Sequence, residues 1–258
     1  MPRTMNGRTA VITGASGGIG AAVAVALAEA GAKVALAGRD RAALERTAAR
    51  CRAADVPVLT VPFDVTVAAE CAEAVAAVTD RLAAPTVLVN AAGIGESRRF
   101  ADVTVDVLRE VMKVNVEGPL LLMQAVLPRM VELGRGAIVN IGSTASSVGL
   151  PRAAPYTAAK HALLGVTRSA AAEYADKGVT INCVCPYYVD TPMTRRVIEA
   201  RMRGKGCDYD EAVRPLLTPQ GRLTTPEEVA ALCLLLASDA GAAITGQALN
   251  IDGGRVQG

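Results

Sequence analysis

Short β-branched segments alternate with longer alanine-rich segments along the chain, and this alternation limits the possible folds more than any other feature. The short segments are nearly continuous apolar runs, as is typical of strands covered on both faces. Strands separated by helices predict βαβ units with right-handed crossovers, and hence an α/β fold with a doubly wound parallel sheet. We expect strands at 9–13, 33–37, 58–61, 86–90, 137–141, 180–184 and 248–251, and helices at 18–30, 41–53, 68–83, 105–133, 155–175 and 226–237.

A length of 258 residues fits one larger α/β domain or two small ones. Because no linker, repeat or low-complexity segment interrupts the pattern, we expect a single domain over 1–258. Residues 191–222 break the alternation and carry several arginines between the sixth strand and the last helix. We expect this segment to pass over the ligand crevice at the carboxyl ends of the strands, as a substrate lid or as a pair of solvated surface helices.

The composition excludes several classes of function. There are 27 basic and 25 acidic side chains, so a net charge of +2 gives no electrostatic basis for binding nucleic acid. The one histidine, His161, excludes any site that needs two imidazoles. The six cysteines form no CxxC pair, and we expect buried, reduced thiols, no metal site and a cytoplasmic protein.

The sequence predicts neither a targeting segment nor a membrane-spanning helix. Residues 1–4 are short and polar, so we expect no targeting segment. Residues 9–28 carry no charge over 20 positions, but four glycines in the middle favour a turn over a membrane-spanning helix.

The glycine-rich run Thr-Gly-Ala-Ser-Gly-Gly-Ile-Gly at 13–20 follows the first strand and opens the first helix. Glycines there permit a tight turn and let the backbone approach a pyrophosphate, while the helix N-terminus offers free N–H groups and a positive dipole end. The run inside a first βαβ unit predicts dinucleotide binding. The expected contacts are Gly14, Ser16, Gly18, Ile19 and Gly20.

The end of the second strand bears on the cofactor. NAD-dependent folds place an acidic residue there for the ribose 2′-hydroxyl, but position 38 is Gly38 and Arg39 follows. The planar guanidinium of Arg39 suits a 2′-phosphate. Asp40 complicates the interpretation, because it can reach the ribose or cap the next helix. We expect NADP(H) in preference to NAD(H).

Tyr156 and Lys160 lie at positions i and i+4 of a predicted helix, and so on one face. Free tyrosine has a pKa of about 10, and a nearby cation favours the phenolate and lowers that value. Ser143 follows the predicted strand 137–141, at the edge of the sheet where ligands bind. These residues are candidates for acid–base chemistry, against the alternative of a chance surface pair.

Over residues 5–255 the chain resembles the short-chain dehydrogenase/reductase family. The resemblance rests on the glycine run, the Tyr-x-x-x-Lys pair, the upstream Ser143, the Asn-Ala-Ala-Gly run at 90–93 and the Asn in Lys-Val-Asn-Val at 113–116. It implies a Rossmann-type fold in which Tyr156 donates a proton to a carbonyl oxygen and Ser143 orients that carbonyl. It further implies that Lys160 lowers the Tyr156 pKa and holds the nicotinamide ribose, and that Asn115 holds a water that relays protons to Lys160.

The same resemblance implies further cofactor contacts. Asp64 and Val65 correspond to the adenine contact, and Asn90 and Gly93 to the wall of the cofactor site, although Asn90 alternatively ties neighbouring strands together. Along the sixth strand and the segment after it, the implied contacts are Pro186, Val189 and Thr191.

One departure from the family concerns the run Pro186-Tyr187-Tyr188, where the family usually has Pro-Gly. Glycine suits a backbone with positive φ or a close approach to a ligand. Tyr187 therefore either adopts a strained turn or reshapes the site beside the nicotinamide. We expect an aromatic-lined substrate pocket formed by Ser143, Tyr187 and Tyr188.

The resemblance extends to bacterial polyketide-type ketoreductases and to 3-oxoacyl reductases. It implies an NADP(H)-dependent reductase of a mid-sized, polyketide-like ketone, free or linked to a carrier or CoA. The alternatives are an NAD(H)-dependent dehydrogenase of a 3-hydroxy acid or its thioester, and a non-catalytic dinucleotide-sensing protein. Arg98 and Arg99 face an acidic substrate or carrier, or simply form a solvated loop. The family also implies a homotetramer.

Overall fold

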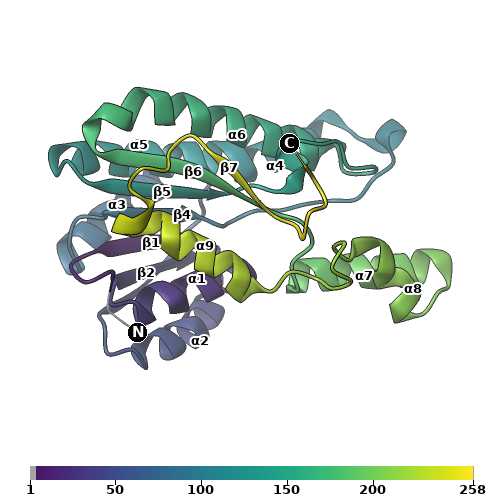
Figure 1. Ribbon diagram of the computed structural model, residues 1–258, viewed down its shortest axis with the longest axis horizontal. Coiled ribbons are helices and arrows are strands. Elements are labelled where there is room, and N and C mark those ends of the chain that lie inside the picture. The colour runs from purple at the N-terminus through teal and green to yellow at the C-terminus, as the bar shows by residue number, and fades with distance from the viewer. Residues whose placement is uncertain (1–3, 258) are drawn as a thin grey trace.

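A computed structural model describes residues 4–257; Gly258 and the first three residues of the polar start lie outside the described residues. It contains one sheet of seven parallel strands in the order β3-β2-β1-β4-β5-β6-β7, which confirms the predicted doubly wound α/β fold (Figure 1). The strands are β1 (Thr9–Thr13), β2 (Lys33–Gly38), β3 (Val58–Pro62), β4 (Val87–Asn90), β5 (Gly136–Ile141), β6 (Val179–Pro186) and β7 (Ala248–Ile251).

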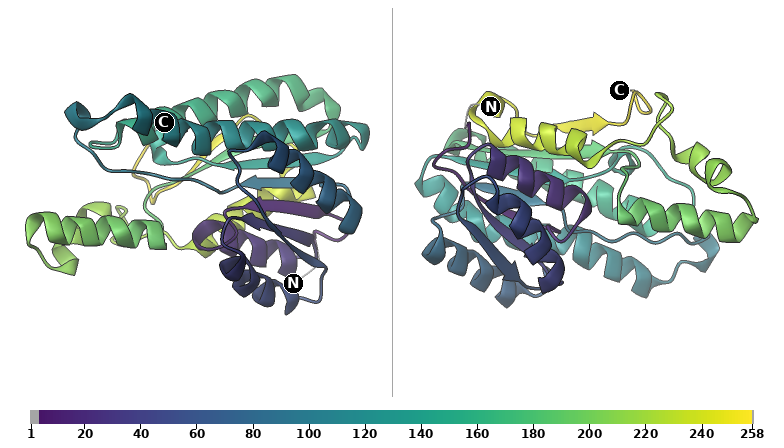
Figure 2. Two further views of the ribbon diagram at one scale, coloured as in Figure 1. Left: turned by 180° about the vertical axis from the view of Figure 1, so that it is seen from behind. Right: turned by 90° about the horizontal axis from the view of Figure 1, so that it is seen from below.

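Two helical layers cover the sheet (Figures 1 and 2). Helices α1 (Gly18–Glu29), α2 (Arg41–Arg52) and α9 (Pro226–Ala237) pack over a core that includes Ile12 and Leu27. Helices α3 (Ala68–Arg81), α5 (Gly118–Glu132) and α6 (Ala154–Tyr174) pack over a second core on the opposite face. The strands are largely apolar because both faces are covered.

The strand order reverses between β1 and β4, so the chain leaves these two neighbours toward opposite faces and opens a crevice at their carboxyl ends. One hydroxyl holds this point together: Thr13 Oγ1 accepts hydrogen bonds from the backbone N–H groups of Ala91 and Ala92, each at 3.0 Å. Because all the strands are parallel, the predicted site residues that follow strands gather at the carboxyl edge of the sheet.

The segment predicted as one helix over 105–133 is helical from Val105 to Glu132, but it is not one continuous α-helix. Helix α4 spans Val105–Met112, a π-helical turn spans Lys113–Glu117, and α5 begins at Gly118. The wider turn lets Asn115 point inward, where its Oδ1 accepts from the Ile94 N–H at 2.9 Å and its Nδ2 donates to the Ile94 carbonyl at 2.8 Å. Such π-turns are frequent at functional sites.

Segment 191–222 forms α7 (Pro192–Lys205), α8 (Tyr209–Val213) and a 3-10 turn at Arg214–Leu216. Figure 1 shows α7 and α8 to one side of the sheet. Their apolar residues form a small cluster of their own, with Ile198, Ala212 and Leu216 at its centre and Tyr188 packed against it. The segment is thus more than a solvated helix pair, although it stands apart from the two main cores.

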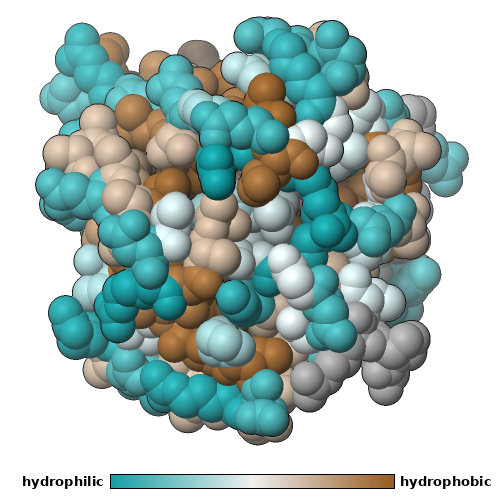
Figure 3. Space-filling view, turned by 90° about the vertical axis from the view of Figure 1, so that its left-hand side faces the viewer, coloured by the Kyte–Doolittle hydropathy of each residue, from teal (hydrophilic) through white to brown (hydrophobic). Residues whose placement is uncertain are grey.

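Figure 3 views the side opposite α7 and α8, where hydrophilic residues are interspersed with small hydrophobic areas. Within residues 4–257, no helix combines the length and the apolar character that a membrane crossing needs. Over the same residues, no three His, Cys, Asp or Glu side chains gather as a metal site would require.

A buried hydrogen-bonded chain links β4, β5 and α6, and its loss has a predictable cost. Asn140 accepts from Asn90 Nδ2 at 2.8 Å and donates to Thr167 Oγ1 at 2.9 Å, and all three residues are buried. We predict that Asn140→Ala lowers the free energy of unfolding by about 2 kcal/mol, because buried polar groups lose their partner. Urea denaturation measures this. The exposed Asn6→Ala serves as control, within about 0.5 kcal/mol of the parent chain; equal values for both variants would contradict the prediction.

Candidate functional site

The first turn of α1 forms a cradle for an anion. Its N-cap is Gly17, no side chain caps the helix, and no acidic residue lies in the first turn, so its N–H groups and positive dipole end are open. The turn is also very close to its neighbours: a Cβ on Gly14, which has φ +65°, would lie 2.8 Å from the Ala91 backbone. Ile19 packs into the core beneath. The residues predicted for a pyrophosphate fit that group.

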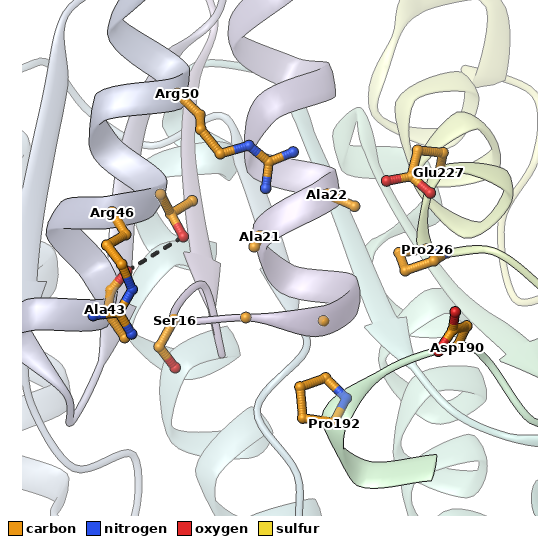
Figure 4. Close-up of a pocket in the computed structure, with 13 residues that line it drawn as sticks. Ser16, Ala21, Ala22, Ala43, Arg46, Arg50, Asp190, Pro192, Pro226 and Glu227 are labelled. Carbon is orange, nitrogen blue, oxygen red and sulfur yellow. Dashed lines mark hydrogen bonds between the residues drawn. The ribbon is translucent and has the colours of Figure 1, made fainter. Parts of the chain in front are cut away.

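A groove of about 300 Å³ extends over this turn, between α2 and α9 (Figure 4). Ser16, Gly17 and Gly18 form its floor, and Arg46 and Arg50 lie on one side of it. Asp190 and Glu227 lie on the other side, as Figure 4 shows. The groove therefore has a basic wall on α2 and an acidic wall toward α9.

The end of β2 leaves room where an NAD-type acid would stand. A Cβ on Gly38 would lie 3.6 Å from Ser16 Oγ, in ordinary contact. Asp40 is committed elsewhere, because its Oδ1 accepts from the Ala43 N–H at 3.0 Å as the N-cap of α2. The pKa of the Asp64 carboxyl is lowered, mainly by hydrogen bonds from Thr66. Arg39 lies close enough to Asp64 to contribute to this lowering through its positive charge. Arg39 and Asp64 thus face the same region.

The other predicted cofactor residues follow the same edge. Val65 and Val189 are buried, and Thr191 caps α7 with its methyl group 3.2 Å from where a Cβ on Gly18 would stand. Pro186 ends β6 in register with Ile251 of β7.

In the Asn90 side chain the Nδ2 atom is hydrogen-bonded and the Oδ1 atom is not. Its Nδ2 donates to Asn140, as the strand-tying alternative requires. Its Oδ1 is buried and has no hydrogen-bond partner among residues 4–257, and the contact of Asn90 with the cofactor stays a prediction.

The four candidate catalytic residues come from three segments, the π-helical turn, the end of β5 and helix α6, and meet at this edge. Ser143 follows β5, and its side chain forms a hydrogen bond with Tyr156 on α6. Lys160, one turn later, is buried with its Nζ 5.5 Å from the Tyr156 ring centroid and donates to the Ile141 carbonyl at 2.6 Å. Gly93 lies next to both Asn115 and Lys160, since a Cβ there would lie 3.1 Å from Asn115 Oδ1 and 3.9 Å from Lys160 Nζ. A phenol, a hydroxyl and an ammonium beside a dinucleotide cradle can hold and protonate a carbonyl oxygen.

The comparisons with known proteins agree with this geometry. A family model described as Enoyl-(Acyl carrier protein) reductase matches residues 14–255. D-beta-hydroxybutyrate dehydrogenase of Rhizobium meliloti is 36% identical, with 96% of this chain and 98% of that protein covered. Galactitol 2-dehydrogenase (L-tagatose-forming) of Cereibacter sphaeroides is 38% identical, with 97% and 95% covered. A variant of actinorhodin polyketide ketoreductase, solved with NADPH, superposes with a TM-score of 0.92 at 35% identity, with 98% of each chain covered.

The chain belongs to the short-chain dehydrogenase/reductase family. It is an oxidoreductase that acts on CH–OH or carbonyl groups. The substrates for which these relatives are named range from a hydroxy acid to a sugar alcohol and a polyketide, so the family does not by itself give the substrate.

Three residues that neighbour the site in this short-chain dehydrogenase/reductase are not among the site residues predicted from the sequence. Gly95 lies against the Tyr156 ring, where a Cβ would come within 3.2 Å of Cδ2. Cys183 and Cys185 alternate along β6 and share one of its faces, with their sulfurs 3.7 Å apart. The Cys183 sulfur lies directly beneath Gly142, so any side chain at 142 would displace it. Only the glycine at 142 hinted at this close contact.

Tyr187 in this short-chain dehydrogenase/reductase does not adopt the strained turn considered above. Among residues 4–257, only Asp55 and Arg152 have positive φ without being glycine. The Tyr187 ring instead packs edge-to-face on Tyr188, with centroids 4.8 Å apart, and its hydroxyl donates to the Pro215 carbonyl at 3.2 Å. The tyrosine at position 187, where the family usually has glycine, thus adds side-chain contacts to Tyr188 and Pro215.

The electrostatics around Tyr156 differ from the expected direction. Burial of the phenol raises the pKa of Tyr156 to about 12, and the hydrogen bond with Ser143 opposes this only in part. Burial also lowers the pKa of Lys160 to about 8. Desolvation disfavours the charged form of both groups, so the expected lowering of the Tyr156 pKa by Lys160 is not found. At neutral pH the phenol is protonated.

This protonation state predicts a pH titration for the chain without cofactor. Because the folded-state pKa of Tyr156 exceeds the ordinary value of about 10, its phenolate forms only above about pH 11. We expect the 295 nm absorbance of the parent chain and of Tyr156→Phe to rise identically up to pH 10.5, with native circular dichroism as the check on folding. A difference between the two that titrates near pH 8 or 9 would contradict the raised pKa.

Proposed function

We propose that the chain is an NADP(H)-dependent ketoreductase that reduces the carbonyl of a mid-sized, polyketide-like substrate. The observation that carries the proposal is the gathering of Ser143, Tyr156 and the buried Lys160 at the carboxyl edge of the sheet, beside the open first turn of α1. Burial keeps the Tyr156 phenol in its protonated form. A reductase needs its acid in this form before the reaction. The substrate class is supported by similarity to the actinorhodin polyketide ketoreductase.

In this mechanism Ser143 and Tyr156 both hydrogen-bond the substrate carbonyl oxygen and orient it. The cofactor supplies a hydride to the carbonyl carbon. Tyr156 gives its proton to the oxygen as negative charge develops there, and the resulting phenolate is stabilised by the Lys160 ammonium on the next turn of α6. Asn115, next to Gly93 and Lys160, is suited to the predicted role of holding a water that returns a proton to Lys160.

The preference for NADP(H) is supported by the end of β2. Gly38 leaves space beside Ser16, Asp40 is used as a helix cap, and the exposed Arg39 is available to a 2′-phosphate. An acidic side chain at position 38 would instead repel that phosphate. The alternative, an NAD(H)-dependent dehydrogenase of a 3-hydroxy acid, draws support from the similarity to D-beta-hydroxybutyrate dehydrogenase.

The proposal includes an assembly. The family resemblance implies interfaces on α6, which carries Tyr156 and Lys160, and on α9 with the segment at 246–254. Leu235 on α9 is 41% exposed. We propose a cytoplasmic homotetramer, and light scattering of the purified chain distinguishes it from a monomer.

The proton-transfer role of Tyr156 is tested by Tyr156→Phe. We predict that ketone reduction falls by about 10²- to 10⁴-fold, since the variant keeps the ring but lacks the proton. NADPH binding, followed by the cofactor's fluorescence, stays within about twofold. Turnover equal to that of the parent chain would contradict the mechanism and favour a non-catalytic, dinucleotide-sensing protein.

The cofactor preference is tested by Arg39→Ala. We predict that KM for NADPH rises about tenfold to a hundredfold, the usual worth of charge-assisted hydrogen bonds to phosphate, while KM for NADH changes less than twofold. Arg52→Ala, at the far end of α2 and paired with Glu45, is the matched control and leaves both values unchanged. Equal losses with NADPH and NADH would exclude the 2′-phosphate role of Arg39.

A further inference from the structure

Tyr187 joins three segments that are distant in sequence. Its hydroxyl donates to the Pro215 carbonyl in the 3-10 turn after α8. The Arg255 guanidinium lies over its ring, with Cζ 5.0 Å from the centroid. Its backbone N–H donates to the Ile251 carbonyl at 3.1 Å. One side chain thus links the end of β6, segment 191–222 and the C-terminal segment.

The C-terminal segment that presents Arg255 is held in place by a buried carboxylate. Asp252 is only 4% exposed, and it accepts from the backbone N–H groups of Gly254 at 2.9 Å and Val256 at 2.8 Å. Gly253, inside the same turn, packs so tightly on Thr218 that a Cβ would come within 2.8 Å of the Thr218 Cβ. The turn is therefore seated on segment 191–222.

The neighbouring Tyr188 packs edge-to-face against Tyr187. It is mostly buried and packs against the cluster of α7 and α8 around Ile198 and Leu216. Its phenol also acts electrostatically on Tyr156 and contributes to the raised pKa of that residue. Tyr188 therefore packs against segment 191–222 and lies near enough to the reacting phenol to act on it electrostatically, and Tyr187 supports it through the edge-to-face contact.

These contacts leave Tyr187 little to offer a substrate directly, since its hydroxyl, one ring face and its contact with Tyr188 are all in use. We propose that Tyr187 and Arg255 are positioning residues that hold segment 191–222 and Tyr188 against the catalytic edge and thereby set the affinity for the carbonyl substrate. The part about affinity rests on the proposed ketone reduction. The part about anchoring does not.

Anchoring is tested by limited trypsin digestion, because α7 carries Arg195, Arg196, Arg201, Arg203 and Lys205. Cleavage after these residues requires local opening of the helix. We expect the first cuts in α7, mapped by mass spectrometry, to appear threefold to tenfold faster in Tyr187→Ala and in Arg255→Ala. The control is Tyr209→Ala, which truncates a half-exposed tyrosine of α8. Rates equal to the parent chain in both test variants would overturn the proposal.

Positioning is tested by steady-state kinetics with a ketone that the parent chain reduces. We expect Tyr187→Phe and Arg255→Ala to raise KM for the ketone threefold to tenfold, with kcat and KM for NADPH within twofold, and Arg255→Lys to restore most of the loss. In the Tyr187→Ala background, Arg255→Ala should have no further effect, because the ring it contacts is gone. The positioning role would be overturned if the KM increases of Tyr187→Ala and Arg255→Ala multiplied in the double variant, or if KM for the ketone did not change in the single variants.

The two experiments separate the proposal from the proposed function. If no ketone is reduced by the parent chain with either cofactor, the proposed function fails while the digestion result still decides whether Tyr187 and Arg255 anchor segment 191–222. If reduction occurs and digestion accelerates without a rise in KM, anchoring stands and positioning of the substrate is excluded.

Discussion

The parallel sheet is the constraint on which the rest of this molecule depends. Because all seven strands run in one direction, the residues that follow them gather at one edge. The reversal of strand order between β1 and β4 opens that edge, and the Thr13 hydroxyl ties the two diverging segments together with two hydrogen bonds. The parallel topology alone therefore places three segments around one crevice: the open first turn of α1, Ser143 after β5 and the Tyr187 region after β6.

Within this crevice, removal from water sets the protonation states. The phenol of Tyr156 is protonated because its charged form is poorly solvated, and the buried Lys160 ammonium is disfavoured for the same reason. A phenolate formed during proton transfer would be stabilised by that ammonium, which lies on the next turn of the same helix. The site as described therefore favours a protonated acid before the reaction, as the proposed reduction requires.

Much of this was predictable from the sequence because it depends on local patterns. Strands β1 and β7 and helix α9 have the predicted bounds, and the spacing of Tyr156 and Lys160 gives their common helix face. What could not be predicted depends on tertiary contacts. A π-helical turn at Lys113–Glu117 interrupts the expected α-helix where Asn115 hydrogen-bonds the Ile94 backbone, a partner 21 residues away. The raised Tyr156 pKa follows from burial, which spacing alone does not reveal. Tyr187 was noticed as a departure from glycine, but its partners Pro215 and Arg255 lie in other segments.

The central claim, that this crevice transfers hydride from NADPH to a ketone, is tested most directly by isotope transfer. NADPH carrying deuterium at C4 of the nicotinamide ring, in separate samples for each face, is incubated with the chain and a panel of cyclic and 3-oxoacyl ketones. Mass spectrometry of the alcohols should find one deuterium on the carbinol carbon from one labelled face only, and about a hundredfold less labelled alcohol, or still less, with Tyr156→Phe. Unlabelled alcohols, or no alcohol from any ketone with either labelled cofactor, would contradict the account.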